Sequence, residues 1–194
     1  MFHSTVFLGS PGSGKSTCGL SYPGVEMHEF GSSEFDTALG FVGRTDILPP
    51  VKLDWFDCLS EEEKAKFSAE GTKEEELGLL SERARAKNII RYRRYLYGLK
   101  ADLLAGKRSE LKTIFLDNFT PFALDFQDYV KVVYAKEFLT KEGNFNSIAF
   151  SIKYQQEVAD FLRFFTSLPC HRVMSCHIGM TVDEETASKV NFMK

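Results

Sequence analysis

The stretch from Gly9 to Ser16 constrains the fold of this chain more than any other part of the sequence, because it reads GSPGSGKS and fits the pattern G-x-x-x-x-G-K-S. In such a loop the glycines let backbone N–H groups turn inward around phosphate oxygens. The loop follows a β-rich run at residues 5–8 and precedes a predicted helix from Lys15 to about Leu20. A strand, a glycine-rich loop and a helix in this order predict a P-loop nucleotide-binding domain.

The residue types of the loop indicate how it would hold a nucleoside triphosphate. We expect Lys15 to bridge the β- and γ-phosphates and the Ser16 hydroxyl to ligate Mg²⁺. The expected ligands are therefore ATP, or a close relative, and Mg²⁺. The residues predicted to bind the nucleotide are Gly9, Ser10, Pro11, Gly12, Ser13, Gly14, Lys15, Ser16 and Thr17.

Alternating strands and helices predict an α/β fold with a mostly parallel sheet flanked by helices. After the strand that precedes the loop, further strands are expected at Val25 to Phe30, Leu111 to Asp117 and Arg172 to His177. Helices are expected at residues 121–139 and 148–168, the second being ended by Pro169. P-loop sheets commonly have five core strands, so four strands indicate that the last core strand is missing.

A length of 194 residues allows one domain with a full core. We expect a single P-loop domain that carries a charged helical insertion at about 45–110 and a hairpin at about 180–192. Within that insertion, residues 54–76 contain nine acidic and three basic residues, whereas residues 82–108 contain nine basic and two acidic ones. The basic block has apolar residues every three or four positions, which predicts an amphipathic helix.

Polar residues at the ends of the later strands are the candidates for catalysis. Asp117 follows four apolar or β-branched residues and is the candidate Walker B acid, which would hold Mg²⁺ together with Ser16. A hydrolytic site also needs a group that orients the attacking water, and Glu29 or Glu34 could serve as this base, with Glu29 slightly favoured. His177 is the candidate γ-phosphate sensor, provided that its strand lies beside the strand of the P-loop.

The basic helix allows two interpretations. Arg83, Lys87, Arg91 and Arg94 fall opposite the apolar stripe. They form either a solvated face that complements the preceding acidic block or a contact surface for the phosphates of single-stranded DNA. Tyrosines interleave with these residues, as in many single-strand binders, although Tyr92 belongs to the apolar stripe.

Other features restrict the class of protein. The net charge of −3 does not indicate a nucleic-acid-binding surface on average, and no apolar run approaches the roughly 18 residues of a membrane span. The N-terminus lacks the pattern of a secretory signal, and four cysteines without C-x-x-C spacing favour a reducing cytoplasm. The pairs Cys170-His171 and Cys176-His177 would lie about 20 Å apart along a strand, which argues against one shared metal ion.

In its order of motifs the chain resembles the phage-encoded RecA-like P-loop ATPases, the AAA-type group associated with phage recombination and single-strand annealing. The resemblance covers residues from Val6 to about His177, and its more specific part is Leu168 to His177, where those proteins tend to have threonine-alanine-histidine and this chain has Ser175-Cys176-His177. It implies a RecA-like core, use of ATP and Mg²⁺, assembly into a ring or filament, and a role in DNA recombination or replication in the host cytoplasm. Carried over by position, it implies phosphate and metal binding by residues 14–17, a Walker B acid at Asp117 and a sensor at His177.

Three departures from that pattern matter. The acid-Thr-Glu-Gly sequence expected after the second strand is here His28-Glu29-Phe30-Gly31, the segment 44–110 is long and individual, and the expected last strand is missing. Two alternative functions therefore stay open: a small-molecule P-loop kinase, with the basic helix as its arginine-bearing lid, and a nucleotide-binding assembly or packaging module with little turnover. Arg44, Arg172 or a residue of the basic helix is the candidate arginine finger.

Overall fold

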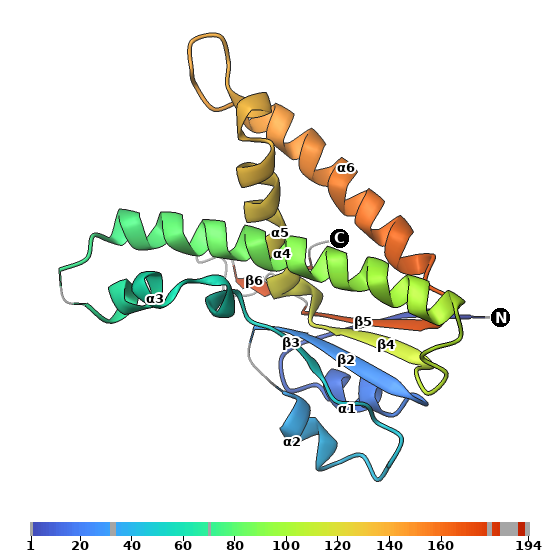
Figure 1. Cartoon of the computed structure of the whole chain (residues 1–194). Coiled ribbons are helices and arrows are strands. Elements are labelled where there is room, and N and C mark those ends of the chain that lie inside the picture. Colours follow the sequence, from blue (N-terminus) through green and yellow to red (C-terminus); the bar gives the residue numbers. More distant parts are fainter. Residues whose placement is uncertain (1, 32–33, 70, 178–179, 183–189, 193–194) are drawn as a thin grey trace. The chain divides into compact units, whose positions relative to one another are not determined.

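The computed structural model describes residues 2–31, 34–69, 71–177, 180–182 and 190–192 (Figure 1). The chain divides into two compact units. The first consists of Met1–Val51, Glu110–Thr120 and Cys170–Lys194, and the second of Lys52–Ser109 and Pro121–Pro169. The sequence indicated one domain with an insertion at about 45–110. The second unit contains most of that insertion and, in addition, the helical segment Pro121–Pro169.

A five-stranded parallel sheet with the strand order β1-β5-β4-β2-β3 forms the centre of the α/β fold. Its strands are β1 (Ser4–Gly9), β2 (Val25–Phe30), β3 (Val51–Leu53), β4 (Thr113–Asp117) and β5 (His171–His177). β-Branched and aromatic residues such as those of β4 favour this extended, buried conformation, and every residue of β2 and β4 is buried. Four of the five strands agree with the sequence prediction.

The prediction of only four strands was wrong. β3 lies beside β2 at one edge of the sheet. It contains only three residues, and it directly follows Pro49-Pro50, which favours an extended connection rather than a strand. A strand this short has too few residues to show an alternating pattern, so its pairing with β2 identifies it and its sequence does not.

Two short helices complete the first unit. α1 (Lys15–Leu20) follows the glycine-rich loop, and α2 (Phe35–Leu39), which the sequence did not predict, follows β2. Their apolar side chains pack with those of the sheet in a cluster that includes Leu20, Met27, Phe35, Ala38, Phe115 and Val173. Gly19 lets α1 approach β4 closely, since a Cβ atom there would lie 2.2 Å from the Phe115 ring.

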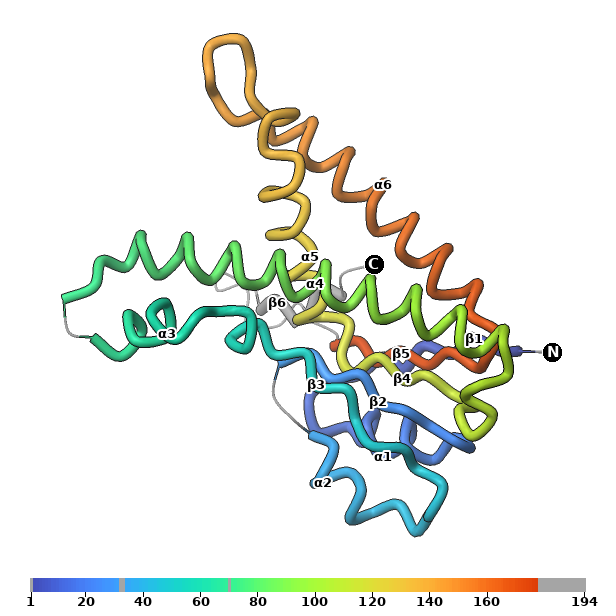
Figure 2. The backbone as a smooth tube through the Cα atoms, in the orientation of Figure 1, coloured from blue at the N-terminus to red at the C-terminus, as the bar shows by residue number. Residues whose placement is uncertain are grey.

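The second unit is helical. Its elements are η1 (Trp55–Cys58), α3 (Glu61–Ser68), α4 (Glu74–Leu104), α5 (Phe119–Val133, which begins in the first unit), η2 (Ala135–Phe138) and α6 (Ser147–Thr166). A capping box between Ser60 and Glu63 begins α3. Figure 2 shows the chain running along α5, reversing through a loop and returning along α6.

Aromatic side chains hold the long helices of the second unit together. Tyr92 of α4, Phe122 and Phe126 of α5 and Phe161 of α6 are all at most 2% exposed, and the centroids of the Phe122 and Phe161 rings are 4.6 Å apart. Tyr92 lies 6.2 Å from Phe122 and 6.3 Å from Phe161. The apolar stripe predicted for the basic helix is therefore a core face, and α4 begins eight residues before the predicted start at Glu82.

The predicted hairpin at about 180–192 lies partly outside the described residues. β6 (Met180–Val182) and β7 (Val190–Phe192) pair in antiparallel fashion, as a hairpin requires. The expected turn around Asp183-Glu184-Glu185 is not among the described residues.

Asp125 is a buried acid of α5, in the second unit. Its carboxylate accepts a hydrogen bond from the Asn88 side-chain amide at 3.4 Å, and the same amide donates to the Leu53 carbonyl at 2.9 Å. Burial raises the pKa of Asp125 to about 7, although Asn88 and Arg85 lower it in part. The folded chain therefore favours the protonated, neutral carboxyl group.

Because the pKa of Asp125 is higher in the folded chain than in the unfolded one, the second unit should lose stability as the pH rises from about 4 to about 7. Asp125→Asn removes the titrating group, and we expect it to raise the free energy of unfolding at pH 8 by roughly 1–3 kcal/mol and to change it little at pH 4. Urea unfolding followed by the fluorescence of Trp55, the single tryptophan, measures this unit. Asp57→Asn, the same change at an exposed aspartate of this unit, is the matched control.

Candidate functional site

The parallel strands bring the predicted site residues to one edge of the sheet. β1 ends at Gly9, directly before the loop, and β5 pairs with it so that Gly9 lies opposite His177. β4 ends at Asp117, opposite Glu29 of β2. Because the carboxyl ends of parallel strands meet at the same edge, residues more than a hundred positions apart in the sequence gather beside the loop.

The glycine-rich loop has the backbone conformation that its sequence predicts. Gly12 and Gly14 have φ angles of 75° and 80°, which residues with a Cβ atom rarely adopt. The ammonium group of Lys15 folds back over the loop and donates to the carbonyl oxygens of Gly9 at 3.1 Å and Ser10 at 2.7 Å. The positive charge of Lys15 is thus held inside the curve of the loop, where a phosphate would lie.

The Ser16 hydroxyl contacts two carboxylates at once. Its oxygen lies 2.7 Å from Oδ2 of Asp117 and 2.7 Å from Oε2 of Glu34, although a hydroxyl has only one proton to donate. The other oxygen of Asp117 accepts a hydrogen bond from Ser175, which is fully buried. The oxygen atoms of Ser16, Glu34 and Asp117 therefore lie together beside Lys15, and the single hydroxyl proton of Ser16 cannot be donated to both carboxylates.

The charge of Asp117 depends on this environment. Burial raises the pKa of its carboxyl group, and the nearby Glu34 raises it further, whereas hydrogen bonds from Ser175 and Ser16 and the charge of Lys15 lower it. A positive ion between the two carboxylates would remove the repulsion between them and take the place of the missing protons.

These side chains fit a Mg²⁺ ion. Mg²⁺ prefers oxygen ligands and in nucleotide sites is bound by one or two protein groups together with phosphate oxygens and water. Ser16 and Asp117, the two metal ligands that the sequence predicted, lie within hydrogen-bond distance of each other, and Glu34 joins them. These three residues would hold the ion, which would supply charge neutralisation for the phosphates.

The two candidates for the catalytic base lie in different surroundings. Glu29 is 3% exposed, and its Oε1 accepts a hydrogen bond from the backbone N–H of Phe35 at 2.9 Å. It therefore holds the first turn of α2. Glu34 is exposed and lines the pocket beside the loop. The structure thus brings Glu34, rather than the slightly favoured Glu29, to Ser16.

The condition set for a sensor at His177 is met, because β5 lies between the P-loop strand β1 and the Asp117 strand β4. The Nε2 atom of His177 lies 3.3 Å from the side-chain amide nitrogen of Asn118. Its backbone N–H donates to the Thr120 hydroxyl at 3.1 Å. His177 is therefore fixed beside the residue that follows Asp117.

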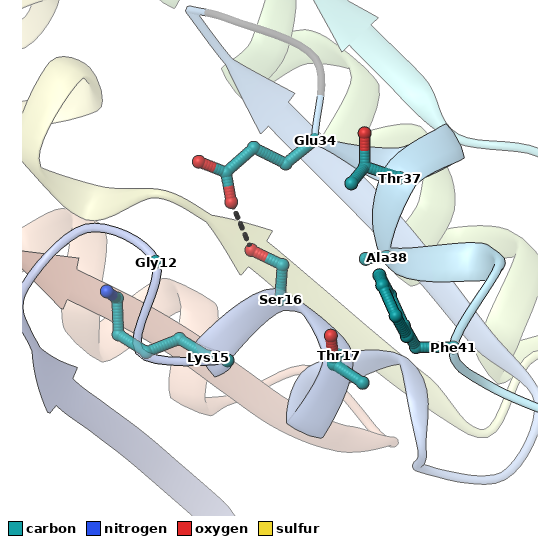
Figure 3. Close-up of a pocket in the computed structure, with 9 residues that line it drawn as sticks. Gly12, Lys15, Ser16, Thr17, Glu34, Thr37, Ala38 and Phe41 are labelled. Atoms are coloured by element: carbon teal, nitrogen blue, oxygen red, sulfur yellow. Dashed lines mark hydrogen bonds between the residues drawn. The ribbon is translucent and has the colours of Figure 1, made fainter.

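A pocket extends from the loop toward α2 (Figure 3). One side is formed by the loop and the start of α1, from Gly12 to Thr17. The other side is formed by Glu34, Thr37, Ala38 and Phe41, whose ring is 77% exposed although it is large and apolar. An exposed aromatic ring beside a phosphate-binding loop offers a surface on which a nucleobase can stack.

Sequence reasoning missed Ser175 and Phe41 as site residues. Ser175 precedes the chosen His177 by two positions, so it lies on the same side of β5, and this alternation was the available signal. Phe41 follows a short helix that was not predicted, and nothing in the sequence placed it near the loop.

Two of the arginines considered as an arginine finger have partners within the chain. Arg44 pairs with Asp46 through two hydrogen bonds of 2.8 Å. Arg172 is 8% exposed and donates to the Cys170 carbonyl at 2.7 Å and to the Ser4 hydroxyl. Both side chains therefore hold the first unit together.

Comparisons with family models, with curated proteins and with solved structures gave no match to this chain. Within the described ranges, none of the helices is both long and apolar enough to cross a membrane.

The two glutamates should differ in their effect on stability. Glu29→Ala leaves the buried N–H of Phe35 without its acceptor, so we expect the free energy of unfolding to fall by about 1–3 kcal/mol. Glu34→Ala, the matched change five residues away, should cost little, because it removes an exposed group and the repulsion between Glu34 and Asp117. Thermal unfolding followed by circular dichroism compares them, and an equal loss in both would contradict this assignment.

Proposed function

We propose that this chain is an ATP-binding P-loop NTPase of the RecA-like type that hydrolyses ATP with Mg²⁺. The observation that carries the proposal is the convergence of Ser16, Glu34 and Asp117 beside Lys15, at the edge where the parallel strands end. A chance glycine-rich turn would have no reason to gather two carboxylates around the serine of its G-K-S sequence.

Each residue has a proposed part in the reaction. The loop from Gly9 to Thr17 binds the phosphates, and Lys15 neutralises the charge that develops on the transferred phosphoryl group. Ser16 and Asp117 hold the metal ion. Of the two acids, Glu34 is our proposed base, because it is the one that lines the pocket and can meet a water molecule at the γ-phosphate.

The larger role is also a proposal. The position of β5 between β1 and β4 supports a sensor at His177, which fits the resemblance to phage-encoded RecA-like ATPases. On this basis the protein acts in DNA recombination, annealing or replication, in the cytoplasm of a host cell and as a ring or filament.

One observation favours a small-molecule P-loop kinase as a second candidate. The pocket continues past Ser16 to Thr37, Ala38 and Phe41, and in a kinase this part would hold the acceptor instead of the nucleobase. The third candidate, an assembly or packaging module, would bind the nucleotide without turning it over.

Phosphate release from ATP separates these functions when it is measured alone, with single-stranded DNA and with a panel of nucleosides. Stimulation by DNA supports the ATPase, whereas ADP release that depends on an acceptor supports the kinase. Binding of ATP without turnover in any condition supports the assembly module and contradicts our proposal.

Lys15→Ala should abolish ATP turnover and weaken ATP binding at least tenfold, because it removes the charge held inside the loop. Isothermal titration calorimetry and phosphate release measure the two effects. Lys107→Ala, at an exposed lysine of the second unit, is the control and should retain both activities. Full activity of Lys15→Ala would refute the central proposal.

Asp117→Asn should leave ATP binding without Mg²⁺ within a few-fold of the original and reduce Mg²⁺-dependent turnover by at least a hundredfold. The amide keeps the shape of the side chain and its bond to Ser16 but loses the negative charge that the ion requires. Turnover measured over a range of Mg²⁺ concentrations tests this, and an unchanged rate would remove Asp117 from the site.

A further inference from the structure

The basic residues of α4 fall into two groups in the second unit. Those that face the other helices have acidic or polar partners there. Arg85 contacts Asp128 at 2.6 Å, and Arg93 contacts Glu157 at 3.2 Å. These charges are part of the packing of the unit.

The second group is the row that the sequence singled out, Arg83, Lys87, Arg91 and Arg94, and all four residues are exposed. They lie within about 80° of one another around the helix and along about 17 Å of its length. Among the described residues, Arg83, Lys87 and Arg94 make no hydrogen bond or ion pair. Arg91 donates to the Asn88 side chain at 3.0 Å and to the Asp54 carbonyl, which are uncharged groups.

The acidic block before α4 does not neutralise this row. Within the described part of the chain, Glu61 pairs with Lys64 and Glu76 with Lys66, and no acid of the block forms an ion pair with a residue of the row. Lys87 acts on Glu63 only at a distance: the pKa of Glu63 is lowered first by the backbone N–H of Ser60 and to a smaller extent by the charge of Lys87. The row therefore keeps a positive charge that the second unit itself does not use.

A shallow depression of about 370 Å³ continues the row. Arg91, Arg94 and Arg108 line it together with the half-buried Tyr95 and with Gly98. Asp102, which also lines it, is paired with Lys107 at 3.3 Å. Arginine side chains beside an aromatic ring form a surface that binds phosphates and stacks on bases.

Gly98 leaves the floor of this depression open. Glycine within a helix is less favourable than alanine, because its backbone loses more conformational freedom, and Gly98 lies well inside the 31-residue α4. A Cβ atom at Gly98 would meet no atom within 4 Å, so packing does not require glycine there. A side chain would instead extend into the depression, toward Arg94 and Tyr95.

We infer that this face of α4 is a binding surface for single-stranded nucleic acid. The row Arg83, Lys87, Arg91 and Arg94 contacts the backbone phosphates, and a base enters the depression at Gly98 and stacks on Tyr95. A single strand fits better than a duplex, because only unpaired bases can enter a pocket and stack on a side chain. The inference deepens the DNA-related part of the proposed function, but the binding itself needs no nucleotide at the P-loop.

The charge contribution is tested by removing the row. Fluorescence anisotropy of a labelled 20-nucleotide oligo-dT is measured with the full chain and with the triple variant Arg83→Gln, Lys87→Gln, Arg94→Gln, whose three residues make no bond that the fold needs. We expect binding at least tenfold weaker and a salt dependence shallower by about 2 in the slope of log K against log salt. The control variant Lys52→Gln, Lys136→Gln, Lys141→Gln changes three exposed lysines away from the row and the depression, alters the net charge equally and should bind as the original does.

The depression is tested with two glycines of the same helix. Gly98→Leu fills the depression, whereas Gly78→Leu adds the same side chain to an open, exposed site near the start of α4. Leucine favours helix at both positions, so neither change should unfold the unit. We expect Gly98→Leu to weaken oligo-dT binding at least fivefold and Gly78→Leu to leave it unchanged.

Three further ligands and the Lys15→Ala variant test which polymer binds and whether binding depends on the glycine-rich loop. Oligo-rU in place of oligo-dT distinguishes RNA from DNA as the preferred strand. Equal binding of duplex DNA or polyglutamate, equal weakening by the control variant, or no effect of Gly98→Leu would overturn the inference. Lys15→Ala should still bind oligo-dT, so a failure of the proposed ATPase function remains distinguishable from a failure of this surface.

Discussion

The parallel pairing of β1, β5 and β4 is the constraint on which the candidate site depends. Because Gly9 lies opposite His177, and β4 pairs with the other side of β5, the glycine-rich loop, the end of β5 and Asp117 share one edge. The close packing of Gly19 on Phe115 then fixes α1 against β4. Together these contacts place Ser16 within 2.7 Å of Asp117, although the two residues are 101 positions apart.

At that edge, electrostatics determines what can bind. Two carboxylates share one hydroxyl proton at Ser16, and the Lys15 ammonium lies on the loop beside them. The site therefore favours a cation next to Asp117 and an anion next to Lys15. A nucleoside triphosphate with Mg²⁺ supplies both, which is why the geometry supports a metal-dependent nucleotide function more readily than a structural role for the loop.

In the second unit, the basic side chains of α4 fall into two groups, one that packs against acidic partners and one that is exposed. Arg85 and Arg93 have acidic partners within the unit, whereas the exposed row on α4 has none among the described residues. Ion pairs that are partly buried orient the helices, and exposed unpaired cations contribute little to stability. A glycine that packing does not require, beside three arginines, indicates that this face serves binding rather than folding.

The sequence by itself predicted the glycine-rich loop between a strand and a helix, four strands of the sheet and the buried stripe of α4, because each depends on local spacing and composition. It also named Lys15, Ser16 and Asp117 as candidate site residues, and the structure brings these three together. It could not determine β3, which is too short to have a pattern, or α2. Nor could it choose between Glu29 and Glu34, or find Ser175 and Phe41. Those assignments depend on which separate segments meet. Ser175 of β5 contacts Asp117 of β4, Glu29 accepts a hydrogen bond from the backbone of Phe35, and Glu34 lies beside Ser16. Only the tertiary structure decides such contacts, because their energies arise between residues that the sequence keeps far apart.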